Sequence, residues 1–198
     1  MMKLPVYQLE ISDDLNDGAE VDFVALVDRP AIERNFLKFK EAKSNFAIQS
    51  ADRRIVSGAL MLADTPIYRN DTNGEYYVIF TKETIEKIAQ KFFKKGYQSN
   101  VNLMHDDSKA VEGVTMYESF IVDSSRGIPA MKGFEDAPEG SWFGSFKVEN
   151  DSVWKQIESG DFKGFSVEGI FNYKKEKQPM SVEEALWAQI SEILEQVK

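Results

Sequence analysis

Two side chains in this chain of 198 residues could together perform nucleophilic chemistry: the single histidine, His105, and Ser166. The chain has no cysteine, which excludes a thiolate nucleophile, and one imidazole is too few for a zinc site built on two or three histidines. Imidazole is the side chain that titrates near neutral pH without perturbation, so acid–base work there falls to His105. We therefore predict that His105 is the base that activates the Ser166 hydroxyl.

The serine lies in the segment GFSVEG, residues 164–169, where two glycines let backbone approach a substrate closely. The spacing differs from the G-x-S-x-G nucleophile elbow, because Gly169 follows Ser166 by three residues. The pattern therefore does not predict an α/β-hydrolase. The alternative interpretation is that a serine in a strand between glycines is structural.

The histidine follows a short apolar run, where we expect a strand to give way to a loop at the mouth of a site. The alternative is a surface or partly buried histidine that bonds to the neighbouring Asp106 and Asp107. A metal site built from these three residues is disfavoured, because adjacent side chains on an extended chain point to opposite faces. We expect no metal and no other cofactor.

A third residue should hold the imidazole in one tautomer and stabilise its charge. Glu118 lies inside an apolar strand, and Glu168 should project from the same strand face as Ser166. We favour Glu118, because an orienting carboxylate should sit behind the histidine, away from the nucleophile. Glu168, Asp106 and Asp107 remain alternatives, and either glutamate could simply face solvent.

The composition is that of one globular domain with a short appendage: 42% of residues are hydrophobic and 29% are charged. The formal net charge of −9 leaves no excess of cations for phosphates, so we expect neither nucleic-acid binding nor attachment to an anionic membrane. The absence of cysteine excludes a disulfide scaffold and permits a reducing cytoplasm. No signal peptide and no apolar membrane-spanning run is apparent in the sequence.

Turn and capping signals divide the chain into about eight strands and three helices. We predict an α+β fold, mainly an antiparallel β-barrel or a strongly curved sheet with surrounding helices, over residues 1–175. A C-terminal helix over residues 176–198, opened by a capping box at Ser181, should cover the core or dock onto a partner. The expected strands are 6–11, 21–27, 54–62, 75–80, 114–120, 128–132, 141–148 and 162–173. The first helix should begin after Thr81 and the second should be capped by Asn150 or Asp151, and we expect residues 36–50 to form a connecting segment.

An ordered series of segments resembles the tailed-phage prohead proteases, specifically the XkdF-like serine protease group. The likeness covers roughly residues 20–173. The segments are VALVDRPAIE (24–33), GALM (58–61), PIYR (66–69), NLMH (102–105), ESFIVD (118–123), GSW (140–142) and GDFKGFSVEG (160–169).

This resemblance implies a fold similar to the herpesvirus assembly protease, assemblin, with a histidine base that precedes a serine nucleophile. His105 and Ser166 match these roles in order. In the herpesvirus enzyme the third member is a second histidine after the serine. This chain has only one histidine, so a carboxylate, for which we favour Glu118, must fill that role.

The resemblance also implies a serine endopeptidase that cleaves phage scaffolding protein, the major capsid protein and itself. It would act inside the immature prohead in the host bacterial cytoplasm. The resemblance leaves open whether the chain forms a homo-oligomer. The alternative is a catalytically inactive capsid assembly or scaffolding protein with a protease-like fold, in which Ser166 and His105 do not meet.

Overall fold

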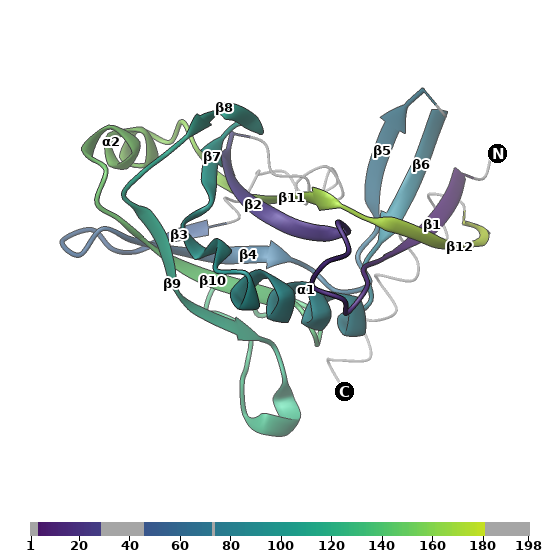
Figure 1. The fold of residues 1–198 in the computed structure, drawn as a ribbon. Coiled ribbons are helices and arrows are strands. Elements are labelled where there is room, and N and C mark those ends of the chain that lie inside the picture. The colour runs from purple at the N-terminus through teal and green to yellow at the C-terminus, as the bar shows by residue number, and fades with distance from the viewer. Residues whose placement is uncertain (1–3, 29–45, 73, 181–198) are drawn as a thin grey trace.

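The computed structural model describes residues 4–28, 46–72 and 74–180. Within these ranges the strands form three sheets of four strands each, accompanied by two α-helices. One sheet stands apart as an arm, whereas the other two sheets and the longer helix form the body of the molecule (Figure 1). The active-site candidates all belong to the body.

The arm sheet has the strand order β12-β1-β6-β5, with β1 parallel to β6 and the other pairs antiparallel. The first body sheet has the order β11-β2-β7-β8, and the second has the order β3-β4-β10-β9. The strands are β1 (Leu4–Glu10), β2 (Glu20–Val27), β3 (Phe46–Ser50), β4 (Ile55–Met61), β5 (Ile67–Asp71), β6 (Gly74–Ile79), β7 (Val101–Leu103), β8 (Asp106–Ala110), β9 (Val114–Ile121), β10 (Trp142–Val148), β11 (Gly164–Ile170) and β12 (Asn172–Met180).

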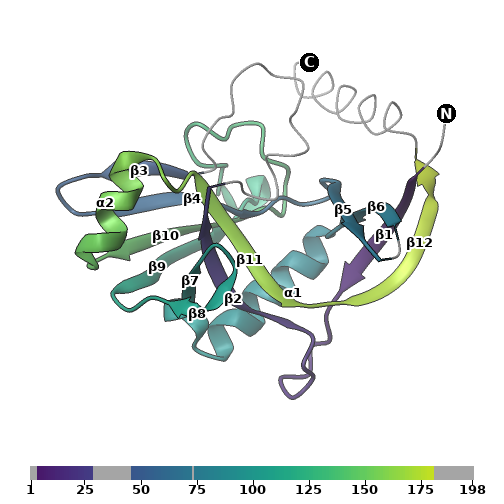
Figure 2. The same ribbon diagram turned by 90° about the horizontal axis from the view of Figure 1, so that it is seen from above.

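A long two-stranded ribbon joins the arm to the body. Only Phe171 separates β11 from β12, and these strands pair in turn with β2 and β1. Seen from above, β11 and β12 follow one continuous curve from the body into the arm (Figure 2). The strand that carries Ser166 is therefore tied at its far end to the arm sheet.

Both α-helices begin and end where local capping signals place them. The helix α1 (Lys82–Lys94) begins after Thr81, whose hydroxyl accepts the backbone N–H of Thr84. The helix α2 (Asp151–Ser159) begins after Asn150 and ends at Gly160 with φ of 80°. The apolar stripe of α1 is buried as predicted except for Phe93, which is 37% exposed.

The main core lies between the two body sheets and α1. The ring of Phe165 from β11 packs against Phe146 of β10, with ring centroids 4.5 Å apart. Phe92 of α1 meets Trp142 of β10 edge-to-face at 5.5 Å. Since β11 contributes Phe165 to this core, the alternate residues of β11 must face the other side of the sheet.

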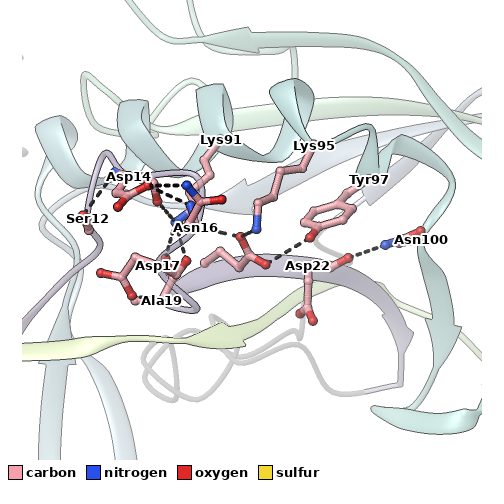
Figure 3. A network of polar contacts seen from close by, with 11 residues as sticks. Ser12, Asp14, Asn16, Asp17, Ala19, Asp22, Lys91, Lys95, Tyr97 and Asn100 are labelled. Carbon is pink, nitrogen blue, oxygen red and sulfur yellow. Dashed lines mark hydrogen bonds and ion pairs between the residues drawn. The ribbon is translucent and has the colours of Figure 1, made fainter.

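A buried lysine fastens the loop between β1 and β2 to α1 (Figure 3). The Lys91 side chain is 3% exposed, and its Nζ donates to the carbonyl oxygens of Asp14, Asp17 and Ala19 at 2.7, 2.8 and 3.0 Å. These three bonds use all three ammonium donors on main-chain acceptors. The lysine therefore fixes the start of β2, the strand next to the proposed site.

The architecture departs from the sequence prediction in several places. The described strands form three separate sheets and no closed barrel; most strand pairs are antiparallel, and two are parallel. The strand predicted over 162–173 is two strands, and only the isolated bridge of Asp123 with Ile128 occurs where 128–132 was predicted. The strands β3, β5 and β8 were not predicted.

The expected domain boundary after residue 175 falls inside β12, which pairs with β1 as far as Met180. Residues 176–180, predicted as part of the C-terminal helical segment, belong to β12, and residues 181–198 lie outside the described residues. The proposed likeness to the herpesvirus protease fold stays a prediction. Neither helix of the described ranges combines the length and apolarity needed to cross a membrane.

Candidate active site

Ser166 lies in the middle of β11 and faces away from the main core. It is opposite Ala25 of β2, and Ala25 is in turn opposite Asn102 of β7. Residues in one row across a sheet point to the same face, so the Ser166 and Asn102 side chains flank the small methyl group of Ala25. Ser166 is 8% exposed and Asn102 is fully buried at 0%.

Glu168 follows Ser166 along β11 and projects from the same face, because the register irregularity of this strand comes only after Glu168. Its Oε1 accepts a hydrogen bond from Nδ2 of Asn102 at 2.7 Å. This bond passes over β2 and joins strands that are about 10 Å apart, two strand spacings. The short side chain of Ala25 leaves room for the two long side chains to meet.

His105 lies in the tight turn between β7 and β8. Leu103 pairs with Asp106, and the two residues between them, Met104 and His105, both have φ of 58°. Positive φ at both central positions is typical of a type I′ hairpin turn, which is unusual for residues other than Gly, Asn and Asp. The turn directs the imidazole toward β11, with Nδ1 of His105 2.9 Å from Oε1 of Glu168.

The His105–Glu168 contact has the geometry of the base and orienting acid of a serine hydrolase. A carboxylate at Nδ1 fixes the ring and stabilises the imidazolium that forms when Nε2 takes a proton. The His105 side chain is 43% exposed, so the ring is accessible from solvent. Within the described part of the chain no hydrogen bond joins Ser166 to His105. Ser166 lies on β11, and His105 contacts Glu168 on the same face of that strand.

The structure does not bring Glu118, the favoured third residue, to His105. Glu118 lies on β9 opposite Ser145 of β10, in the other body sheet, and its side chain is exposed. The sequence shows that Glu118 is inside an apolar strand but not which sheet that strand joins. The carboxylate beside His105 is that of Glu168, which was one of the alternatives.

Asp106, which follows His105, binds Lys109 and Ser108 instead of the imidazole. The carboxylate of Asp106 lies 2.8 Å from Nζ of Lys109 and accepts the Ser108 hydroxyl. These two interactions lower the pKa of Asp106 to about 2. The side chain of Asp107 lies outside what the structure describes, and no group of three metal-ligating side chains occurs in the described ranges.

Gly169 has a role that differs from the predicted one. A Cβ atom at this position would lie 2.1 Å from the carbonyl oxygen of Glu20 and 2.8 Å from Cα of Val21. The glycine therefore allows β11 to approach the backbone of β2, rather than a substrate, directly after Glu168.

Two residues of this arrangement, Asn102 and Ala25, were not predicted to take part. Asn102 offered a signal, because an amide inside an otherwise apolar segment next to the only histidine needs a buried partner. Ala25 offered none, because its small size matters only once β2 is known to lie between β11 and β7.

The sequence of this chain is similar to a known family of proteins. Residues 44–175 match the family described as "Putative phage serine protease XkdF", which is more than half of the chain. The chain therefore belongs to this family of phage serine proteases. The predicted class of protein is confirmed at that level.

Two curated relatives come from Bacillus subtilis (strain 168). The uncharacterized protein YqbD is 27% identical over 175 residues, which cover 84% of this chain and 49% of YqbD. The phage-like element PBSX protein XkdF is 26% identical over 169 residues, which cover 81% of this chain and 56% of that protein. The chain thus spans about half the length of these relatives. No solved structure matches it significantly.

Proposed function

We propose that this chain is a serine endopeptidase of phage head maturation, with Ser166 as nucleophile, His105 as general base and Glu168 as the orienting acid. The observation that carries the proposal is the contact of 2.9 Å between His105 Nδ1 and Glu168 Oε1 on the face of β11 that also bears Ser166. Membership of the phage serine protease family supports the reaction class.

In the proposed reaction the Ser166 Oγ attacks the carbonyl carbon of a peptide bond while its proton moves to Nε2 of His105. The negative charge of Glu168 stabilises the resulting imidazolium. When the tetrahedral intermediate collapses, the C–N bond breaks and His105 gives its proton to the leaving amine. A water molecule, deprotonated by His105, then hydrolyses the acyl-enzyme and releases Ser166.

The edge of β11 offers a place for an extended substrate. The backbone groups of Val24 and Leu26 point toward β7, since Val24 N donates to Asn100 O and Met104 N donates to Leu26 O, each at 3.0 Å, and these two partners flank β7. Backbone groups alternate in direction along a strand, so those of Ala25 bond to β11, and the N–H and C=O of Val167 point away from β2.

The described residues contain no further strand beyond β11 in this sheet. We therefore propose that a substrate segment pairs with this edge at Val167, next to Ser166. Scaffolding protein, the major capsid protein and the chain itself are the proposed substrates, inside the prohead in the host cytoplasm.

Co-expression with the cognate scaffolding and capsid proteins tests the proposed activity. The native chain should shorten its substrates, whereas Ser166→Ala and His105→Ala should leave them intact. Ser159→Ala, an exposed serine at the end of α2, is the matched control and should cleave normally. Cleavage that persists in Ser166→Ala would reject the assignment and favour a non-catalytic assembly protein with this fold.

A further inference from the structure

Asn102 is the one member of this polar group whose role is not explained by the reaction itself. Its side chain is 0% exposed, and its Nδ2 donates to Glu168 Oε1 at 2.7 Å. Its Oδ1 is buried and has no hydrogen-bond partner in the described part of the chain. A buried acceptor without a partner lowers stability, so the amide is not explained by stability alone.

The hydrogen bonds at Glu168 determine which nitrogen of the neighbouring imidazole carries the proton. An amide nitrogen can only donate, so Oε1 of Glu168 must act as an acceptor toward Asn102. A carboxylate oxygen has no proton to give, so Nδ1 of His105, which meets the same oxygen, donates to it. In a neutral imidazole with its proton on Nδ1, the lone pair is on Nε2, the nitrogen that a general base uses.

We propose that Asn102 is a positioning residue that holds Glu168 in place as a hydrogen-bond acceptor and thereby keeps His105 in the Nδ1–H tautomer. The catalytic importance of this tautomer rests on the proposed function, because the Nδ1–H form is the one that can accept the Ser166 proton at Nε2. Asn102 acts through Glu168 and touches no reacting atom.

The geometry explains why an asparagine suits this position. Asn102 and Glu168 lie on strands separated by β2, and the amide reaches the carboxylate over the methyl group of Ala25. An aliphatic side chain of similar size would fill the space but donate nothing. Glu168 would then be free to change rotamer, and the imidazole would lose its fixed acceptor.

Nitrogen-15 NMR of the imidazole tests this directly, because the chain contains only one histidine and its ring signals need no assignment. In the native chain at a pH where the ring is neutral, Nδ1 should carry the proton. Asn102→Leu should move the population toward a mixture with the Nε2–H form. Glu168→Ala should give the reference spectrum of an unrestrained ring.

Asn100→Leu is the matched control, because the Asn100 Nδ2 donates to the carbonyl oxygen of Asp22 at 2.9 Å and not to Glu168. This variant should keep the native tautomer. If Asn102→Leu does not fold, the smaller Asn102→Ala gives the same readout. A folded Asn102 variant with the native tautomer ratio would overturn the proposal.

The same variants separate this proposal from the proposed function. The tautomer is measured without turnover, so it decides the role of Asn102 even if Ser166 proves unreactive. If the chain is a protease, Asn102→Leu should lower kcat by about 10–100-fold with KM retained, as loss of a partner that orients a site histidine does in metal sites. An equal loss in Asn100→Leu would point to a structural effect and overturn the proposal.

Discussion

His105 Nδ1 and Glu168 Oε1 lie 2.9 Å apart, and this contact joins the β7–β8 turn to β11 across the intervening strand β2. Neither partner is near the other in sequence, and neither strand pairs with the other. Ala25 of β2, which lies opposite Ser166 on one side and Asn102 on the other, leaves room on this face, and β11 approaches the backbone of β2 closely at Gly169. The proposed catalytic group is thus a product of the strand order.

The identity of the orienting carboxylate can be tested with two glutamates. Glu168→Gln should lower the rate of peptide cleavage by about 10⁴-fold, because an amide neither fixes the same tautomer nor stabilises the imidazolium. Glu118→Gln is the control and should stay within about twofold, since Glu118 is exposed in the other body sheet. A large loss with Glu118→Gln and none with Glu168→Gln would restore the assignment made from the sequence.

The contact between β11 and β2 at Gly169 can be tested by stability. Gly169→Ala should lower the free energy of unfolding by about 2 kcal/mol, because the added methyl group meets the Glu20 carbonyl oxygen and the strands must separate. Gly18→Ala is the matched control, with nothing within 4 Å of the added atom, and should be neutral or stabilising by about 0.5 kcal/mol. Equal urea midpoints for the two variants would contradict this packing.

Lys91 should be far more important for stability than other lysines of α1. Lys91→Met should lower the free energy of unfolding by about 3 kcal/mol, because three main-chain carbonyl oxygens lose a charged donor whose side chain is itself buried. Lys87→Met is the control, since Lys87 makes an exposed ion pair with Asp13 and should change stability by less than about 0.5 kcal/mol. Similar unfolding curves for both variants would show that the Lys91 contacts are not formed.

The proposed substrate edge predicts an asymmetry between two proline substitutions. Val167→Pro should keep the fold, because its N–H points away from β2, but should raise KM for peptide cleavage by about tenfold through loss of one substrate hydrogen bond. Val24→Pro should destabilise the chain by about 3 kcal/mol, because the Val24 N–H is bonded to Asn100 O. Unchanged KM in a folded Val167→Pro chain would exclude this mode of substrate binding.

The titration of the Asp106 carboxyl group shows whether this carboxylate pairs with Lys109 or with His105. Its pKa in the folded chain is about 2 against an ordinary value of 3.8, so the stability it contributes is present above pH 3.8 and is lost as the pH falls through 2. Carbon-13 NMR of the carboxyl group should give a midpoint near 2 in the native chain, and Lys109→Gln should raise it. A native midpoint near 4 would contradict the Asp106–Lys109 pairing.

Local features of the fold could be predicted from the sequence, whereas pairings across the sheets could not. Thr81, Asn150 and Gly160 mark helix ends because each cap involves only neighbouring residues. The strand β8 escaped prediction because its sequence, DDSKA, has no apolar alternation, and it forms only as the return strand of the His105 turn.

The proposed site shows the same division. Ser166 and His105 stand out by residue type and by their surroundings in sequence. The choice between Glu118 and Glu168 depends on which strands are neighbours, and the parallel pairing of β2 with β7 has no local sequence signal. Glu168 could be recognised only as a residue on the same face as Ser166, which did not distinguish it from a solvent-facing side chain.

The most direct test of the central claim is the site of covalent labelling by a fluorophosphonate, in which an activated serine oxygen displaces fluoride from phosphorus. Peptide mass spectrometry of the labelled full chain should place the phosphonyl group on Ser166. Labelling should be lost in Ser166→Ala and strongly reduced in His105→Ala and Glu168→Gln. A folded chain that is not labelled even in the presence of the proposed scaffold and capsid substrates, or a label on another serine, would contradict the proposed catalytic role of Ser166, His105 and Glu168.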